Sequence, residues 1–266
     1  MDEPELSIRF APELRMFLAP RDRQGHQVEA CGARVALDAT STLGHLVEAC
    51  GVPLPEVGRL VVGGRAVAPS YRPANGDDAY VDAVARPQRL PGPPRFVLDV
   101  HLGALARRLR LVGVDAAYRN DLDDDALIAQ ANAEQRVLLT KDRGLLRRRR
   151  LWLGAYVRGD HPDRQLADML DRFAPRLAPW TRCTTCNGVL EGVPKSEVEH
   201  LLRPGTRRTY DAFARCTACG RVYWPGAHHG RLAEIVRAAE DAERRFLAPR
   251  RAPARRHAAH HWPPAG

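Results

Sequence analysis

The stretch FVLDVHLGALARRLRLVGVDAAY, residues 96–118, predicts a strand, a helix and a second strand in direct succession. Its middle part carries apolar residues at helical spacing, namely Leu102, Leu105, Leu109 and Val112. Gly113 is suited to end the helix, because glycine adopts a left-handed backbone at no steric cost. We expect three arginines of the helix to face largely away from the core: Arg107, Arg108 and Arg110.

The same alternation continues downstream. Asp123 is expected to cap a second helix, and apolar runs at RVLLT (136–140) and LGAYV (153–157) predict two more strands. A further helix is expected after Asp163. Strands that alternate with helices at this spacing predict an α/β domain with a parallel sheet and right-handed crossovers.

The N-terminal residues predict a different fold. LSIRF (6–10) and ARVALD (33–38) alternate like strands, Ser41 is expected to cap a helix through Cys50, and RLVVGGRAV followed by DAYVDAV predicts two more strands. This ββαββ order resembles the ubiquitin-like β-grasp fold of the small sulfur-carrier proteins. Those carriers work through a free C-terminal diglycine, whereas this chain continues. We therefore expect a docking or stabilising role, with another protein as the partner.

Four of the six cysteines lie in two similar motifs, CTTCNG and CTACGR. Each CxxC spacing lets two thiolates bind one ion, and the flexible residue that follows lets backbone N–H groups point at the sulfurs. The motifs predict a closed, structural zinc site, and a redox pair or an iron–sulfur cluster is the alternative. The ligands of the predicted zinc site are Cys183, Cys186, Cys216 and Cys219. The long separation between the motifs predicts a zinc ribbon with an inserted loop at 190–209.

Acidic residues follow three of the predicted strands of the α/β domain. Asp99 ends the first, a group from Asp121 to Asp125 follows the second, and Asp142 lies two residues beyond the third. Ligands of parallel sheets bind beyond the carboxyl ends of the strands. Clustered carboxylates need a cation, and hard oxygen ligands favour Mg²⁺ or Mn²⁺. Each acid also has a simpler interpretation as a helix cap or turn former.

Charge is unevenly distributed along the chain. Residues 1–85 hold 8 Arg and 12 acidic residues, whereas the remainder holds 33 basic and 20 acidic residues. This asymmetry predicts that the C-terminal two-thirds binds a polyanion, most simply nucleic acid. Basic residues that follow the third strand are candidate phosphate contacts: Lys141, Arg143, Arg147 and Arg148. Tyr223 and Trp224 could stack on unpaired bases, and packing within the ribbon is their alternative role.

Several of these segments together resemble the Mut7-C ribonuclease family over about residues 95–232. They are FVLDVHLGALARRLRLVGVD, NDLDDDALI, RVLLTKDRGLLRRR, RCTTCNGVLE and FARCTACGRVYWPGAH. That family is similar to PIN-domain nucleases with an appended zinc ribbon, and its bacterial members often carry a β-grasp domain in front. Lys141 stands where the family usually has Arg.

The resemblance implies hydrolysis of RNA by a metal-dependent site. It implies Asp99, Asp124 and Asp142 as ligands of a catalytic Mg²⁺ or Mn²⁺ ion, with Asp121 and Asp125 as additional candidates. His228, in the family-like GAH element, is implied as a proton donor or phosphate contact. The rival interpretations are a non-catalytic zinc-ribbon protein that binds RNA or regulates, and an interaction scaffold centred on the β-grasp domain.

The expected organisation has six parts. They are a β-grasp domain (1–86), a proline-rich linker (87–94), a PIN-like ribonuclease domain (95–178), a four-cysteine zinc ribbon (179–232), a C-terminal helix (233–248) and a disordered tail (249–266). No apolar run approaches the roughly 20 residues that span a bilayer. The N-terminus lacks the features of a signal peptide, so we expect a cytoplasmic protein without a membrane partner.

Overall fold

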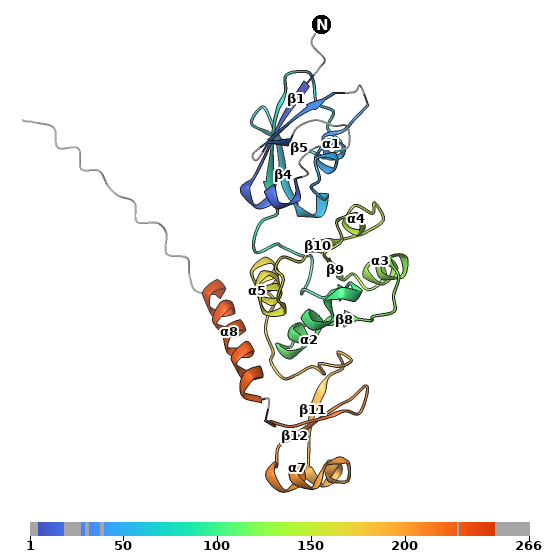
Figure 1. Cartoon of the computed structure of the whole chain (residues 1–266), viewed down its shortest axis with the longest axis vertical. Helices are drawn as coiled ribbons and strands as arrows, with labels where there is room; N and C mark the ends of the chain where they lie inside the picture. The colour runs from blue at the N-terminus through green and yellow to red at the C-terminus, as the bar shows by residue number, and fades with distance from the viewer. Residues whose placement is uncertain (1–4, 19–27, 30–31, 38–39, 228, 248–266) are drawn as a thin grey trace, which may run out of the picture.

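The computed structural model describes residues 5–18, 28–29, 32–37, 40–227 and 229–247. Three parts follow one another along its longest axis (Figure 1): a domain with a six-stranded sheet, a domain with a four-stranded sheet, and a three-stranded ribbon. His228 and the predicted tail lie outside the described residues. No described helix is long and apolar enough to cross a membrane.

The N-terminal domain confirms the predicted mixed α/β fold with a β-grasp order. Its elements are β1 (Glu5–Phe10), η1 (Pro12–Phe17), β2 (Val28–Glu29), β3 (Gly32–Ala36), α1 (Leu43–Ala49), η2 (Leu54–Glu56), β4 (Val57–Val62), β5 (Arg65–Val67) and β6 (Asp78–Ala83). The strand order is β2-β3-β1-β6-β4-β5, and β1 runs parallel to β6. Helix α1 contributes Leu43, Leu46 and Val47 to the core.

Two details of this domain differ from the sequence prediction. Thr42, and not Ser41, caps α1, since its side chain accepts a hydrogen bond from the His45 N–H. The segment RLVVGGRAV forms two antiparallel strands around Gly63 and Gly64. Both glycines have positive φ, the backbone that a two-residue hairpin turn requires.

The second domain confirms the predicted parallel sheet. Its elements are β7 (Phe96–Leu98), η3 (Val100–Leu102), α2 (Gly103–Leu111), β8 (Ala116–Tyr118), α3 (Asp124–Ala133), β9 (Val137–Thr140), α4 (Arg143–Leu146), β10 (Gly154–Tyr156) and α5 (Pro162–Phe173). The strand order is β10-β9-β7-β8, and every pairing is parallel. Gly113 follows α2 with φ +84°, and a side chain there would collide with the Ala178 carbonyl.

Helices cover both faces of this sheet. Phe96 and Leu98 of β7 pack into a core with α2 and α5, whereas Val97 packs into a separate core with α3. Successive residues of a strand point to opposite faces of the sheet. Because helices cover both faces, all three residues of the run FVL are buried. The C-terminal helix α8 (His229–Leu247) also packs on the α5 side (Figure 1), where it buries Val236 and Ala239. It therefore starts earlier than predicted and completes the core of this domain.

The ribbon contains more regular structure than the predicted insertion loop. Its elements are β11 (Leu190–Val193), α6 (Lys195–Val198), η4 (Glu199–Leu201), α7 (Pro204–Thr209), β12 (Phe213–Cys216) and β13 (Val222–Tyr223). The three strands pair antiparallel in sequence order. Strand β11 and three short helices thus occupy the segment expected to be a loop. Strand β11 forms there because it pairs with β12.

A buried ion pair joins the first two domains. Glu56 accepts a hydrogen bond from Arg172 of α5 at 2.5 Å and another from the Tyr156 backbone N–H, and both charged side chains are 0% exposed. The proline-rich segment predicted to be a linker lies against the same helix. Within it, Gln88 bonds to the Arg172 guanidinium, and the adjoining Arg86 pairs with Asp168. The β-grasp domain is therefore docked on α5.

Replacing Glu56 with Ala should destabilise the protein by about 3 to 5 kcal/mol, because it leaves the Arg172 charge buried without its partner. Chemical denaturation measures the change. The matched control is Asp78→Ala, which breaks the solvent-exposed pair with Arg9 and should cost about 0 to 1 kcal/mol. If the two variants were equally stable, the buried pair would not be what holds the domains together.

Candidate functional site

The strand order places a topological switch point at the carboxyl edge of the parallel sheet. The chain leaves β7 for β8 on one side and later returns to β9 on the other side. Such a switch point is where ligands of open parallel sheets bind. Asp99 follows β7 directly, and Asp142 follows β9 after one residue. The two acids therefore lie at the two strand ends that border this switch point.

Thr140 links these two acids. Its hydroxyl donates a hydrogen bond of 2.6 Å to Asp99 Oδ2 and accepts one of 2.8 Å from the Asp142 N–H. Thr140 is fully buried, Asp99 is partly buried and Asp142 is exposed. Sequence reasoning missed this residue. The available signal was a single hydroxyl at the end of an otherwise apolar strand.

The other candidate acids lie at the start of α3. Asp123 caps this helix as predicted, by accepting from the Ala126 N–H. Asp124 is the first helical residue and is exposed. Asp121 pairs with Arg119, whose hydrogen bond lowers the pKa of that carboxyl, and Asp125 pairs with Arg150.

The acids do not form a closed cluster. Among the described residues, the four cysteines are the only group of three or more potential metal ligands whose ligand atoms all lie within 4.8 Å of one another. The Thr140 hydroxyl thus joins the Asp99 carboxylate to the Asp142 backbone, while the Asp142 carboxylate caps α4.

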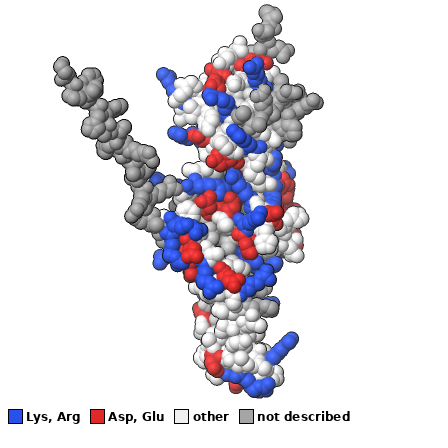
Figure 2. Space-filling model, turned by 60° about the vertical axis from the view of Figure 1, so that its left-hand side comes forward, with Lys and Arg blue, Asp and Glu red and all other residues white. Residues whose placement is uncertain are grey.

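The structure gives different surroundings to the candidate basic residues. Lys141 and Arg148 are exposed, and Arg147 is half-buried. Arg143 instead contacts the β-grasp domain, where it donates to the Met16 and Phe17 carbonyls at 2.8 and 2.9 Å and lies over the Phe17 ring. Figure 2 shows Lys and Arg gathered over the middle of the molecule among acidic residues, above a ribbon that is mostly uncharged on this face.

The four predicted zinc ligands do converge. Cys183 and Cys219 have sulfurs 3.7 Å apart, and the Cys186 and Cys216 sulfurs are 3.4 Å apart. A tetrahedral site with Zn–S bonds of about 2.3 Å has sulfurs separated by roughly 3.8 Å. The Cys186 and Cys219 backbone N–H groups point at the sulfurs of the preceding cysteines, at 3.5 Å each. The cluster could therefore hold a metal ion such as zinc.

The environment of these thiols also favours a bound cation. Burial raises the pKa of the Cys183 thiol, but hydrogen bonds from the Tyr223 hydroxyl and from backbone N–H groups outweigh it and lower the pKa to about 6. Burial and the neighbouring thiols raise the pKa of Cys186 to about 12. A side chain at Gly188 would lie 2.8 Å from Cys216 Sγ, so only glycine leaves enough room beside this sulfur. Four such close sulfurs can all be thiolates only beside a cation.

Two side chains attach the first cysteine motif to the parallel-sheet domain. Arg110 was expected to face away, but it is 2% exposed and donates to the Thr184 and Thr185 carbonyls, because the ribbon covers that face of α2. Asn187 adopts a positive φ of 72°, and its side chain bonds to the Ala116 N–H and to Asp115. The ribbon is thereby fixed at the amino edge of the sheet.

Comparisons with known proteins give two family matches. A model described as the Mut7-C RNAse domain matches residues 94–236, and one described as Mut7-C ubiquitin matches residues 3–89. No curated protein and no solved structure matches the chain. The first match alone spans more than half of the 266 residues, and the order of the two agrees with the sequence prediction.

Proposed function

Because the chain belongs to the Mut7-C RNAse domain family, we propose that it is a metal-dependent ribonuclease whose catalytic acids are Asp99, Asp124 and Asp142. The observation that carries this proposal is the Asp99–Thr140–Asp142 arrangement at the carboxyl edge of the sheet. The family match suggests RNA as the substrate. We place the phosphodiester at the carboxyl edge between β7 and β9, because ligands of open parallel sheets bind at such a switch point.

The residues at this edge fit a Mg²⁺ or Mn²⁺ ion. Mg²⁺ is usually held by one or two carboxylates and keeps several waters, so Asp99 and Asp142 would suffice, with Asp124 as a further oxygen ligand. Asp99 has one oxygen bound by Thr140, and its other oxygen has no bonding partner among the described residues. The ion would ionise a water and offset the negative charge of the phosphate.

Each protein residue then has a defined task. Thr140 holds the Asp99 carboxylate and the Asp142 backbone, which makes it a positioning residue. Lys141 directly follows β9, and both Lys141 and Arg148 are exposed. They would contact phosphates, which gives affinity without sequence preference. A zinc ion in the cysteine cluster has a structural role, because four thiolates leave no open position for a substrate.

The test is cleavage of a labelled single-stranded RNA by protein freed of Mg²⁺ and Mn²⁺. We expect cleavage only when one of these ions is returned. Elemental analysis of the zinc content checks that the ribbon is still intact. Binding of the RNA without cleavage under every divalent ion would instead identify a non-catalytic RNA-binding protein. Cleavage that is indifferent to chelators would contradict the proposed metal chemistry.

A further inference from the structure

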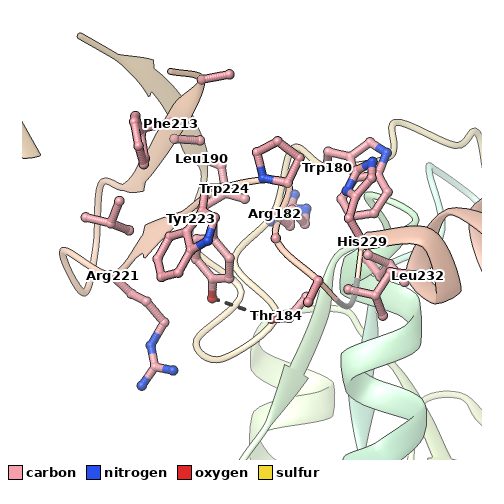
Figure 3. Close-up of a pocket in the computed structure, with 17 residues that line it drawn as sticks. Trp180, Arg182, Thr184, Leu190, Phe213, Arg221, Tyr223, Trp224, His229 and Leu232 are labelled. Atoms are coloured by element: carbon pink, nitrogen blue, oxygen red, sulfur yellow. Dashed lines mark hydrogen bonds between the residues drawn. The ribbon is translucent and has the colours of Figure 1, made fainter. Parts of the chain in front are cut away.

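A cavity of about 590 Å³ lies between the zinc ribbon, the end of α2 and the start of α8 (Figure 3). Aromatic side chains form much of its wall, and apolar residues such as Leu111, Leu190 and Leu232 form the rest. This volume lies within the range typical of sites that bind small molecules. The cavity lies outside the carboxyl edge described above, so the proposed catalytic site does not account for it.

Two exposed tryptophans border the cavity. Trp180 is 39% exposed and Trp224 is 41% exposed, which is high for a residue type that is strongly buried on average. Trp180 stacks on His229 with ring centroids 4.8 Å apart and has a positive φ of 64°. A bulky residue in this region of φ is strained, and such strain concentrates at functional sites. The fold thus keeps Trp180 in a backbone conformation that is unfavourable in free energy.

The opposite wall of the cavity contacts the cysteine cluster. The Tyr223 hydroxyl lies 3.0 Å from Cys183 Sγ, and Trp224 follows Tyr223 directly. A side chain at Gly226 would lie 2.9 Å from the Trp224 indole nitrogen, so glycine lets the chain pass close to this ring. Both aromatic walls are therefore positioned by neighbouring structure and are not merely loose surface groups.

The charged side chains that the structure places in the cavity wall are all positive. Arg182 and Arg221 line it, and no acidic residue does among those that the structure describes. Arg221 is exposed and extends outward in Figure 3, whereas Arg182 is partly engaged by Asp115. An apolar peptide would need only the aromatic walls. A nucleotide would use both the aromatic faces and the positive rim, which favours the nucleotide as occupant.

We propose that this cavity binds an unpaired base of the RNA substrate, stacked against Trp180 and Trp224, with Arg221 near the adjoining phosphate. The inference rests on the proposed ribonuclease function, which supplies RNA as the ligand. Stacking on aromatic side chains is tolerant of sequence, because every base has an aromatic face.

The cavity is distant from the proposed catalytic acids. Helix α2 starts just beyond Asp99 and ends at Leu111, whose carbonyl accepts from the Trp180 N–H. Nine helical residues span about 14 Å. A stacked strand advances about 3.4 Å per nucleotide, so an RNA needs at least about four nucleotides to span this length. The cavity therefore selects RNA long enough to reach it.

The test measures binding of a 12-nucleotide single-stranded RNA in the absence of divalent cations, so that cleavage does not enter. Trp224→Ala should raise the Kd by about 5- to 150-fold, the loss that corresponds to one stacked base. Trp224→Phe should restore most of the affinity. Trp152→Ala is the matched control, because Trp152 is 43% exposed and lies outside the cavity, and it should bind as the wild type does.

Two further measurements guard against an effect of misfolding. Trp180→Gly removes the second ring at a position whose positive φ suits glycine, so it should weaken binding while the zinc content stays the same. A 12-nucleotide RNA that lacks its bases should bind weakly to the wild type, and Trp224→Ala should not weaken it further. Wild-type affinity in both tryptophan variants, or equal affinity for the RNA without bases, would overturn the proposal.

The cleavage assay separates this inference from the proposed function. For Trp224→Ala we expect a higher KM with the 12-nucleotide substrate and an unchanged KM with a trinucleotide, which is too short to span both sites. A protein that binds the longer RNA through the tryptophans but never cleaves it would refute the ribonuclease function and leave the cavity assignment intact. An equal change in KM for both substrates would refute the cavity assignment alone.

Discussion

The Asp99→Asn protein is expected to bind RNA as well as the wild type does, or more tightly, and to lose cleavage by more than about 100-fold. Loss of a residue that only supports a metal ligand costs about 10- to 100-fold, so loss of a ligand should cost more. Binding persists because the substitution removes a negative charge from beside the phosphate.

Stability should barely change in this variant. The side-chain carbonyl of the introduced asparagine can still accept the hydrogen bond that Thr140 donates to Asp99 Oδ2 in the wild type. Asp142→Asn is the companion variant, since asparagine also caps helices well and can replace the acceptor that the Gly144 and Leu145 N–H groups use at the start of α4. Both substitutions thus remove charge with little effect on structure.

Thermal melting and Mn²⁺-dependent cleavage of one labelled RNA provide the measurement. Asp123→Asn is the control, because it neutralises the neighbour of Asp124 and keeps the cap of α3. It should cleave at the wild-type rate. If Asp99→Asn and Asp142→Asn did the same, these acids would not be catalytic, and the rival interpretation as an RNA-binding protein would gain support.

The second large effect concerns the ribbon. Cys183→Ser should abolish zinc binding and unfold the ribbon, because the metal supplies the folding free energy of such modules, about 10 to 16 kcal/mol in small zinc-finger peptides. The wild type should contain one zinc per chain. The variant should also lose the RNA contacts of the cavity, whose wall includes Tyr223 beside Cys183.

Elemental analysis and limited proteolysis across residues 183–223 measure both consequences. Cys50→Ala is the control, since Cys50 is a fully buried thiol in the β-grasp core and should leave the zinc content unchanged. Iron in place of zinc, or a ribbon that stays protected in the Cys183 variant, would contradict a structural zinc site.

Local patterns made much of this architecture predictable. The CxxC spacing identified four sulfurs that do converge, and short apolar runs identified every strand of the parallel sheet. The acids at the strand ends could be found for the same reason, because the end of a strand is a local property of the sequence. Whether Asp124 joins Asp99 and Asp142 stays a prediction.

The contacts that sequence reasoning missed join segments far apart in the chain. Arg172 and Glu56 are 116 positions apart, and Arg143 and Phe17 are 126 positions apart. Arg110 looked like a solvated arginine because nothing near it in the sequence shows that the ribbon covers it. Burial of an arginine depends on its partner, and one sequence does not reveal that partner.

Arg143 joins the N-terminal domain to the segment that carries a proposed catalytic acid. This side chain holds two carbonyls of η1, and its backbone directly follows Asp142. The segment that carries this proposed catalytic acid is therefore attached to η1 of the β-grasp domain. The two domains thus meet within one residue of Asp142, and the docking of the β-grasp domain supports the carboxyl edge of the sheet.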